Sequence, residues 1–167
     1  MIGYFAVLLL VIFVSVYAIL RLHQLNAGTR HILNIDNRML DHEEKLADAI
    51  LSQLRYEKKY VLTRDILLYK QFLSAKEDFA KFLSELFLIV DTPEKTDSLN
   101  LVKAHYQRFQ SLIDKEADNV RASQSYIKRG YEQEMERASD GILEELKKLE
   151  VYSRRDIEQR MKMLGES

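Results

Sequence analysis

The first 20 residues contain no charged side chain, and this stretch constrains the fold more than any other feature of the sequence. It reads MIGYFAVLLLVIFVSVYAIL, in which only Gly3 and Ser15 lie outside the hydrophobic set. All 25 Lys and Arg residues and all 26 Asp and Glu residues come after it. As a helix it would be about 30 Å long, which matches the hydrocarbon core of a bilayer. Residues 1–20 therefore predict a retained transmembrane helix.

A cleaved signal peptide is the competing interpretation of this stretch. It requires a basic flank, an apolar run of about 7–15 residues and a small-x-small cleavage site, and the sequence has none of these. Arg21, Arg30 and Arg38 follow the run, which by the positive-inside rule favours a cytoplasmic C-terminal side. That rule is weak for flanks longer than about 60 residues, such as 21–167. The missing N-terminal flank suggests that the chain is part of a longer protein.

Composition excludes several classes of fold and of chemistry. Five glycines and one proline are too few for a sandwich or a barrel with many tight turns. The absence of cysteine excludes disulfides, thiolate metal sites and covalently attached c-type haem. The near balance of charge gives no indication of nucleic acid as a partner. The scattered glycines form no phosphate-binding loop, and the four histidines form no zinc or di-iron motif, so we expect no cofactor, no metal and no catalytic residues.

Apolar residues after Leu20 recur at spacings of three and four, which is typical of helices packed in bundles or coiled coils. We predict an all-α chain with helices over about 21–62, 65–90, 94–120 and 127–165. Thr63 or Asp65 would cap the second helix, and Thr92 would cap a third helix whose first residue is Pro93. The third turn is expected somewhere between Asp118 and Gly130.

Short loops make consecutive helices antiparallel, so the expected architecture is an up-down-up-down four-helix bundle over residues 21–167. Helices 1 and 4 are longer than the other two and would extend as a stalk on the membrane side, with a second transmembrane helix after Ser167. Four apolar stripes are expected to form the core, and they include Ile66 on the second helix and Met161 on the fourth. The aromatic residues of the second helix and its partners are assigned to the same core. Asp41, His42, Glu43 and Glu44 are assigned to the solvated face of the first helix.

Basic residues gather at the first and third turns, which antiparallel packing would bring to the same end of the bundle. They are Lys58, Lys59, Arg64, Arg121, Lys128 and Arg129. Cations near helix termini are suited to a carboxylate or phosphate, so the cluster is a candidate site for a small anionic ligand. The competing interpretation is a solvated surface with ion pairs to Glu57, Asp65, Asp118 and Glu132.

The layout resembles the input half of bacterial transmembrane sensor histidine kinases, and methyl-accepting chemotaxis receptors share that plan. The most specific part is the stretch Arg55-Tyr56-Glu57-Lys58-Lys59-Tyr60-Val61-Leu62-Thr63-Arg64-Asp65. It is similar to the corner between helices 1 and 2 of such sensor domains, where an Arg-x-x-x-x-Tyr/Phe-Leu-x-Thr-x-Asp pattern precedes an aromatic-rich helix. Here that helix supplies Tyr69, Phe72 and Phe79.

The resemblance implies a single-pass segment in the bacterial inner membrane, with residues 21–167 outside the cytoplasm. It also implies a homodimer in which helix 1 packs on helix 1, and a signal carried by a small displacement of helix 4. The segment would have no enzymatic activity of its own, and any kinase domains would lie beyond Ser167. A chemotaxis-receptor input domain and a stand-alone single-pass helical scaffold remain the alternatives. The sequence does not identify the stimulus.

Overall fold

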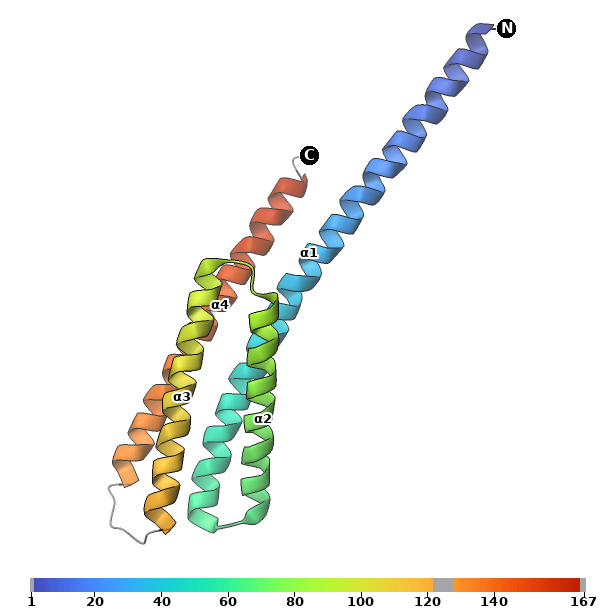
Figure 1. Ribbon diagram of the computed structural model, residues 1–167. Helices are drawn as coiled ribbons and strands as arrows, with labels where there is room; N and C mark the ends of the chain where they lie inside the picture. Colours follow the sequence, from blue (N-terminus) through green and yellow to red (C-terminus); the bar gives the residue numbers. More distant parts are fainter. Residues whose placement is uncertain (1, 122–127, 166–167) are drawn as a thin grey trace. The chain divides into compact units, whose positions relative to one another are not determined.

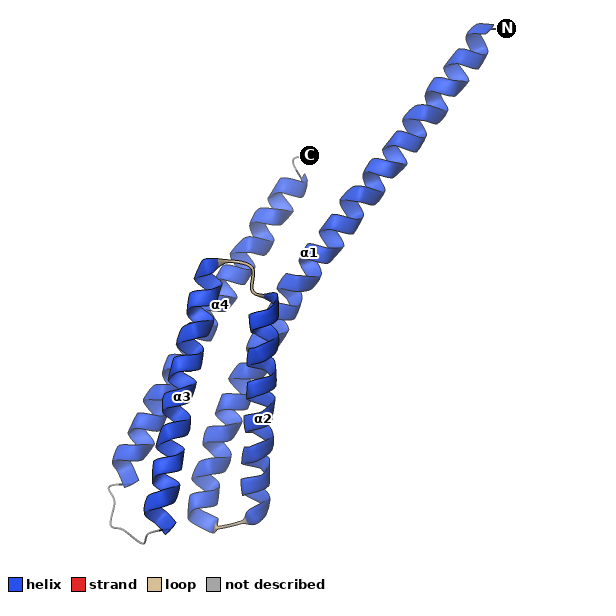
Figure 2. Cartoon of the chain, viewed as in Figure 1, coloured by secondary structure: helices blue, strands red, loops and turns tan. Residues whose placement is uncertain are grey.

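The computed structural model describes the backbone of residues 2–121 and 128–165, and side chains at 13–17, 37–116, 119 and 130–163. It contains α1 (Ile2–Thr63), α2 (Ile66–Ile89), α3 (Pro93–Arg121) and α4 (Lys128–Gly165), as Figures 1 and 2 show. The described residues include no strand. The prediction of an all-α bundle is therefore confirmed, and the helix bounds agree with the predicted ones to within a residue or two after residue 62.

The chain divides into two units, Met1–Asn37 and Arg38–Ser167, and the boundary falls within α1. The first unit consists of helix alone over its described residues. The second unit contains the rest of α1 together with α2, α3 and α4, and all the packing described below lies within it.

The corner between α1 and α2 is built by three consecutive residues. The Thr63 hydroxyl donates to the carbonyl of Lys59 at 2.9 Å, in the last turn of α1. Arg64 adopts a left-handed conformation with φ 57°, which reverses the chain. Asp65 is the N-cap of α2, because its Oδ1 accepts from the N–H of Leu67 at 2.8 Å. Of the two predicted caps, Asp65 holds the N-cap position and Thr63 closes α1 instead.

The corner between α2 and α3 follows the prediction. Pro93 is the first residue of α3. Thr92 precedes it and accepts from the N–H of Lys95 through its hydroxyl at 3.4 Å and from the N–H of Thr96 through its carbonyl at 3.0 Å. Proline suits this position because its missing N–H would have had no partner within the helix. The predicted third turn falls largely on residues 122–127, which lie outside the described residues.

Neighbouring helices of the second unit run in opposite directions, as the order of their contacts shows. Contacts between α1 and α4 join Glu43 to Ser153 and Lys58 to Glu136. Contacts between α3 and α4 join Lys95 to Asp156 and Asn119 to Tyr131. Contacts between α1 and α2 join His42 to Glu85 and Gln53 to Ala75. In each pair, residues later in one helix meet residues earlier in the other.

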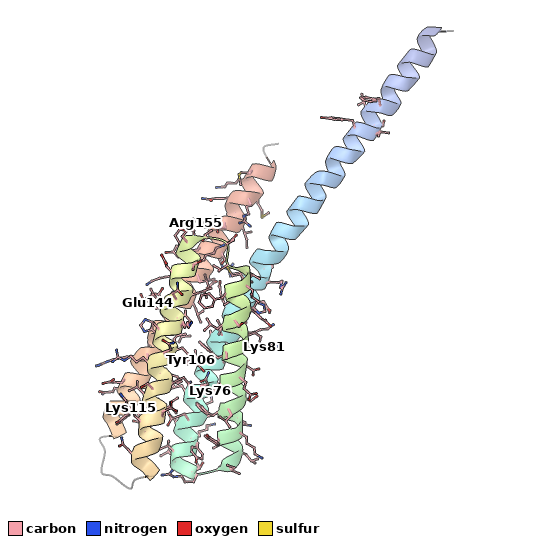
Figure 3. The ribbon with its side chains drawn as sticks, viewed as in Figure 1. Lys76, Lys81, Tyr106, Lys115, Glu144 and Arg155 are labelled. Atoms are coloured by element: carbon pink, nitrogen blue, oxygen red, sulfur yellow. The ribbon has the colours of Figure 1, made fainter. Side chains whose placement is uncertain are left out.

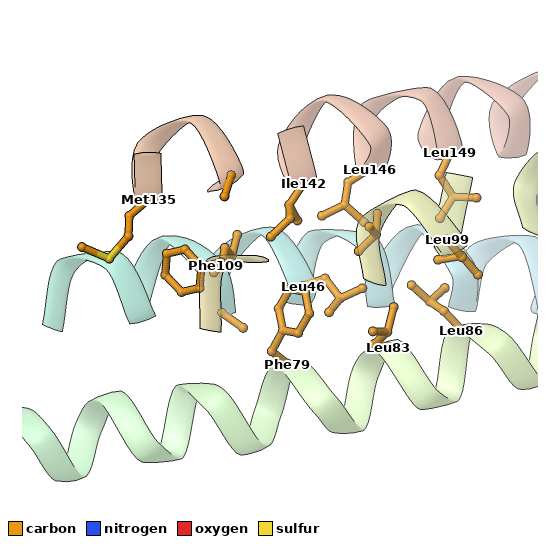
Figure 4. Close-up of a cluster of buried hydrophobic side chains, with 14 of the residues drawn as sticks. Leu46, Phe79, Leu83, Leu86, Leu99, Phe109, Met135, Ile142, Leu146 and Leu149 are labelled. Carbon is orange, nitrogen blue, oxygen red and sulfur yellow. The ribbon is translucent and has the colours of Figure 1, made fainter. Parts of the chain in front are cut away.

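All four helices contribute to one apolar core (Figure 4). Its fully buried members include Leu46 and Ile50 on α1, Phe79 and Leu86 on α2, Leu99 and Phe109 on α3, and Ile142 and Leu149 on α4. These are positions that the heptad spacing predicts. Of the residues in the predicted stripes, Leu22, Leu25, Ile32, Ile35, Ala117, Val120 and Leu164 lie outside the described side chains.

Three residues assigned to the core are exposed instead. Ile66 is 59% exposed, Met161 is 58% exposed and Tyr69 is 36% exposed. Ile66 is the first residue of α2, at the corner where the core ends. Met161 comes one residue after Arg160, which already pairs with Asp91 in the turn before α3. The apolar periodicity continues beyond the part of each helix that its neighbours cover, so the assignment of these three residues to the core was wrong.

The segment assigned to the solvated face of the first helix is also partly buried. His42 is 7% exposed and Glu43 is 5% exposed, whereas Asp41 and Glu44 are exposed. The reason is that α1 packs against α2 on one side and against α4 on the adjacent side. The Nε2 atom of His42 lies 3.3 Å from the Glu85 carboxylate of α2, and Glu43 faces α4.

Candidate functional site

A hydrogen-bonded network of uncharged side chains crosses the interior between α1, α2 and α3. Gln53 is fully buried, and its Nε2 donates to the carbonyl of Ala75 at 3.2 Å. Its Oε1 accepts from the hydroxyl of Tyr106 at 3.2 Å and from Nε2 of Gln110 at 2.9 Å. Burial raises the pKa of Tyr106 to about 12, so the phenol stays protonated and acts as a donor. Figure 3 shows Tyr106 on α3.

The hydrogen bond to the Gln53 oxygen fixes the orientation of the Gln110 amide. Its NH₂ group faces Gln53, so its Oε1 points away from the network. This oxygen is buried and accepts no hydrogen bond from the described residues. A buried acceptor without a donor costs about 1–3 kcal/mol, so the Gln110 oxygen marks a place where a donor would be favoured.

A cavity of about 530 Å³, here called the corner cavity, lies beside this network, near the corner between α1 and α2. Its apolar wall consists of Tyr60, Val61, Ile66, Tyr69, Phe72, Leu73 and Ile113. Its polar lining consists of Glu57, Arg64, Lys76, Gln110, Asp114 and Glu116. The rings of Tyr60 and Tyr69 are 5.1 Å apart, and those of Tyr69 and Phe72 are 6.2 Å apart. Aromatic walls with a few polar groups are typical of small-molecule sites.

The charges of the corner cavity are unevenly distributed with depth. Glu57 is 7% exposed and Glu116 is 3% exposed, so two carboxylates lie inside. Of the cations in the lining, Arg64 is exposed and Lys76 is half-buried. Figure 3 shows Lys76 on α2. Buried carboxylates thus belong to the lining, and its described cations are the more exposed groups.

The six predicted basic site residues are placed differently from one another. The Lys58 ammonium lies 2.6 Å from Oε1 of Glu136, so it joins α1 to α4. Lys59 is exposed in the last turn of α1, and Arg64 lines the corner cavity. Arg121 ends α3 and Lys128 begins α4, but the side chains of both, and of Arg129, lie outside the described residues. Anion binding by this set stays a prediction.

A second polar region lies between α1 and α4. A groove of about 710 Å³, here called the α1–α4 groove, is lined by Leu40, Asp41, Glu43, Glu44 and Ala47 of α1 and by Leu143, Leu146, Lys147, Glu150 and Arg154 of α4. Burial raises the pKa of Glu43 to about 8, and the carboxylate of Glu150 adds to this shift. The hydrogen bond from Ser153 opposes it. Glu43 thus titrates near neutral pH.

Charged side chains hold the start of α3 to α4. Lys95 is fully buried, and its ammonium lies 2.9 Å from Asp91 and 2.7 Å from Asp156. The guanidinium of Arg160 lies 2.7 Å from the other oxygen of Asp91. Burial lowers the pKa of Lys95, but the hydrogen bonds to Asp156 and Asp91 outweigh it and leave the pKa above its usual value. Lys95 therefore keeps its charge, and this Lys95 cluster, which consists of Asp91, Lys95, Asp156 and Arg160, fixes α3 against α4.

The sequence analysis missed Glu43, Gln53, Lys95 and Gln110. One signal was available, because Ser153 interrupts an otherwise apolar stripe of α4. A polar residue at a core position indicates a polar partner on another helix, and here the partner is Glu43.

Comparison with protein-family models, with curated proteins and with solved structures finds no match to this chain. The described residues contain no group of three or more His, Asp or Glu side chains that could hold a metal ion. The predicted transmembrane stretch, residues 1–20, lies for the most part outside the described side chains. Among the residues that could be assessed, no helix is long and apolar enough to cross a membrane.

Proposed function

We propose that the chain is the signal-input region of a bacterial transmembrane receptor of the sensor-kinase type, with a chemotaxis receptor as the variant of the same plan. In this proposal residues 1–20 anchor the chain in the inner membrane. Residues 21–167 form an extracytoplasmic up-down-up-down bundle, in which α1 and α4 continue as a stalk. A stimulus at the bundle displaces α4 relative to α1, and the displacement passes inward.

The apolar stretch at the N-terminus supports the membrane anchor. Phe13, Val14, Val16 and Tyr17 are 75%, 55%, 50% and 57% exposed. At 100° per residue, these four positions cover an arc of about 160° of the helix. The sequence of residues 1–20 has no charged side chain on any face, and a helix that is apolar all round requires an apolar environment. A lipid bilayer meets this requirement.

The continuity of α1 is the observation that carries the proposal. One helix, Ile2–Thr63, contains both the apolar stretch and the residues that contact α2 and α4. A helix transmits displacement along its axis because its backbone hydrogen bonds join each turn to the next. In this proposal a change in the packing of α1 at Glu43 acts on the same continuous helix that contains residues 1–20.

The two interfaces of α4 differ in a way that favours movement of α4 with α3 and against α1. The Lys95 cluster fixes α4 to α3 by buried ion pairs. The interface with α1 contains the α1–α4 groove, a titratable Glu43 and the partly exposed pair of Lys58 and Glu136. Polar, incompletely filled interfaces can hold two packings at similar energy, whereas interlocked apolar ones resist sliding.

We extend the proposal to a parallel homodimer with α1 packed on α1. Leu51 is 41% exposed on the outer face of α1, and Leu101 on α3 is 47% exposed. The chain has no cysteine, so Leu51→Cys and Leu101→Cys each introduce a unique thiol. Oxidation in membranes should cross-link the Leu51→Cys chain and leave Leu101→Cys monomeric. Equal cross-linking of both variants, or of neither, would exclude this dimer.

Side-chain labelling tests the membrane topology. Asp140 is exposed on α4, so Asp140→Cys offers one accessible thiol. In bacterial spheroplasts that express the full chain, a membrane-impermeant maleimide should label this variant without permeabilisation. Labelling that requires detergent would place the bundle in the cytoplasm and overturn the receptor proposal. Recovery of the chain in the soluble fraction would overturn the membrane anchor.

A further inference from the structure

The polar groups deep in the corner cavity share one property, which is that they accept hydrogen bonds. Gln110 presents Oε1, because its NH₂ group is engaged with Gln53. Glu57 and Glu116 present carboxylates. A carboxylate has about four acceptor positions on its two oxygens, so each can accept from a ligand in addition to a protein donor. A ligand that enters this cavity is therefore favoured if it brings several N–H donors.

The wall of the cavity adds a second constraint. Tyr60, Tyr69 and Phe72 present aromatic rings in succession along one side. Ring faces attract cations within about 6 Å, and they also pack against apolar groups. The carboxylates of Glu57 and Glu116 are buried, whereas the cations of the lining are exposed or half-buried. The ring faces and the acceptor groups together suit a ligand that carries N–H donors and a positive charge.

We propose that the corner cavity binds a small organic cation, such as a primary amine or an amidine attached to an apolar body. Its N–H groups donate to the Gln110 oxygen and to the carboxylates of Glu57 and Glu116, and its apolar body lies against the aromatic wall. The cavity volume of about 530 Å³ is within the range of pockets that enclose small molecules. This inference deepens the proposed function, because it names the class of stimulus that the bundle receives.

The cavity also lies where a ligand can act on packing. It joins the end of α1 to α2 and α3, and Gln110 connects it to Gln53 in the centre of the bundle. A cation that draws Gln110 and Glu57 together changes the relative position of α1 and α3. A ligand shifts an equilibrium between packings only if it binds them differently, and contacts with three helices provide such a difference.

The test uses three probes that share a phenyl ring and a two-carbon chain, namely 2-phenylethylamine, 2-phenylethanol and phenylacetate. Binding to the purified full chain in detergent micelles is measured by isothermal titration calorimetry. The expected result is binding of the amine and not of the alcohol or the acid. Preferential binding of phenylacetate would overturn the proposal in favour of an anion site. Equal binding of amine and alcohol, or binding of none of the three at millimolar concentration, would also overturn it.

Variants locate the site. Gln110→Leu removes the unpartnered acceptor and should weaken amine binding by about tenfold, which is the usual effect of losing one hydrogen bond to a charged group. Gln107→Leu, exposed on the same helix and outside the cavity lining, is the matched control and should leave binding unchanged. Unchanged amine binding in Gln110→Leu would exclude this cavity as the site.

Because Gln110→Leu also breaks the bond to Gln53, a second variant guards against a folding defect. Glu116→Gln leaves the bond between Gln53 and Gln110 in place and removes one negative charge. It should also weaken binding of the amine. If Glu116→Gln binds the amine as well as the unaltered chain does, the cation proposal fails. These titrations need no signalling output. Amine binding without helix movement would contradict only the receptor proposal, and helix movement without amine binding would contradict only the cation site.

Discussion

The hydroxyl of Ser153 lies 3.2 Å from Oε1 of Glu43 and 2.9 Å from the carbonyl oxygen of Leu149, so it contacts two acceptors with one hydrogen. A serine hydroxyl can donate to only one of them at a time. Both contacts become hydrogen bonds if the Glu43 carboxyl is protonated and donates to Ser153, while Ser153 donates to Leu149. The geometry of the hydroxyl and the raised pKa of Glu43 thus agree on a neutral carboxyl below about pH 8.

This protonation predicts a specific pH dependence of stability. Because the pKa of Glu43 is about 8 in the folded chain and 4.5 in its reference state, Glu43 favours folding most below about pH 4.5. That contribution is lost as the pH rises through 8, by up to about 5 kcal/mol at roughly 1.4 kcal/mol per pKa unit. Glu43→Gln mimics the protonated carboxyl and removes the titration, so it should raise the melting temperature relative to the unaltered chain at pH 8 but not at pH 4.5.

The matched control for this prediction is Glu44→Gln, which changes the exposed neighbour of Glu43. Thermal unfolding followed by circular dichroism between pH 4.5 and pH 9 gives the comparison. Parallel melting curves for Glu43→Gln and Glu44→Gln across this range would show that the carboxyl of Glu43 ionises normally.

The Lys95 cluster predicts a large loss of stability for a single substitution. Lys95→Met keeps the length of the side chain but leaves Asp91 and Asp156 without their shared cation. Breaking a buried ion pair on one side costs about 3–5 kcal/mol. Lys45→Met, which breaks an exposed pair with Asp41, should cost no more than about 1 kcal/mol. Similar melting temperatures for the two variants would contradict the assigned role of Lys95.

The corner between α1 and α2 predicts effects of opposite sign for two glycine substitutions. Arg64 has φ 57°, where a side chain costs about 1–2 kcal/mol, so Arg64→Gly should stabilise the chain by up to about 1 kcal/mol. Arg55→Gly, in the exposed interior of α1, should destabilise it by about 1 kcal/mol. Loss of stability in both variants would show that Arg64 makes a contact that outweighs its strain.

The cap at the same corner can be measured separately. Asp65→Ala removes the acceptor of the Leu67 N–H and should cost about 1 kcal/mol. Thr63→Ala removes an exposed bond to the Lys59 carbonyl and a longer one, at 3.3 Å, from the Asp65 N–H, and it should cost less. The order of the two melting temperatures distinguishes the N-cap from the residue that closes α1, and a lower melting temperature for Thr63→Ala would reverse the assignment.

The helices and two of their turns could be predicted from local sequence. Heptad spacing identifies the core because burial on one side of a helix repeats every three or four residues, and Pro93 and Asp65 mark helix starts by chemistry confined to one turn. Information of this kind lies within a few residues, so a single sequence is enough to reveal it.

The polar interior could not be predicted in the same way. Glu43 contacts Ser153, and Lys95 contacts Asp156. In both cases the partner is distant in sequence. Spacing rules assign a charged residue to solvent unless its remote partner is known. The left-handed Arg64 escaped prediction because glycine is the usual residue at that position after a helix.

The central claim is that α4 moves with α3 and against α1, and distances between spin labels test it most directly. Arg55→Cys with Asp140→Cys measures α1 against α4, and Lys103→Cys with Lys147→Cys measures α3 against α4, at positions exposed on each helix. With the full chain in lipid nanodiscs, raising the pH from 6 to 9 ionises Glu43 and should shift the α1–α4 distance distribution while leaving the α3–α4 distribution unchanged. The shift should vanish in Glu43→Gln. An α1–α4 distribution that stays the same at both pH values, or that shifts equally in Glu43→Gln, would contradict the account.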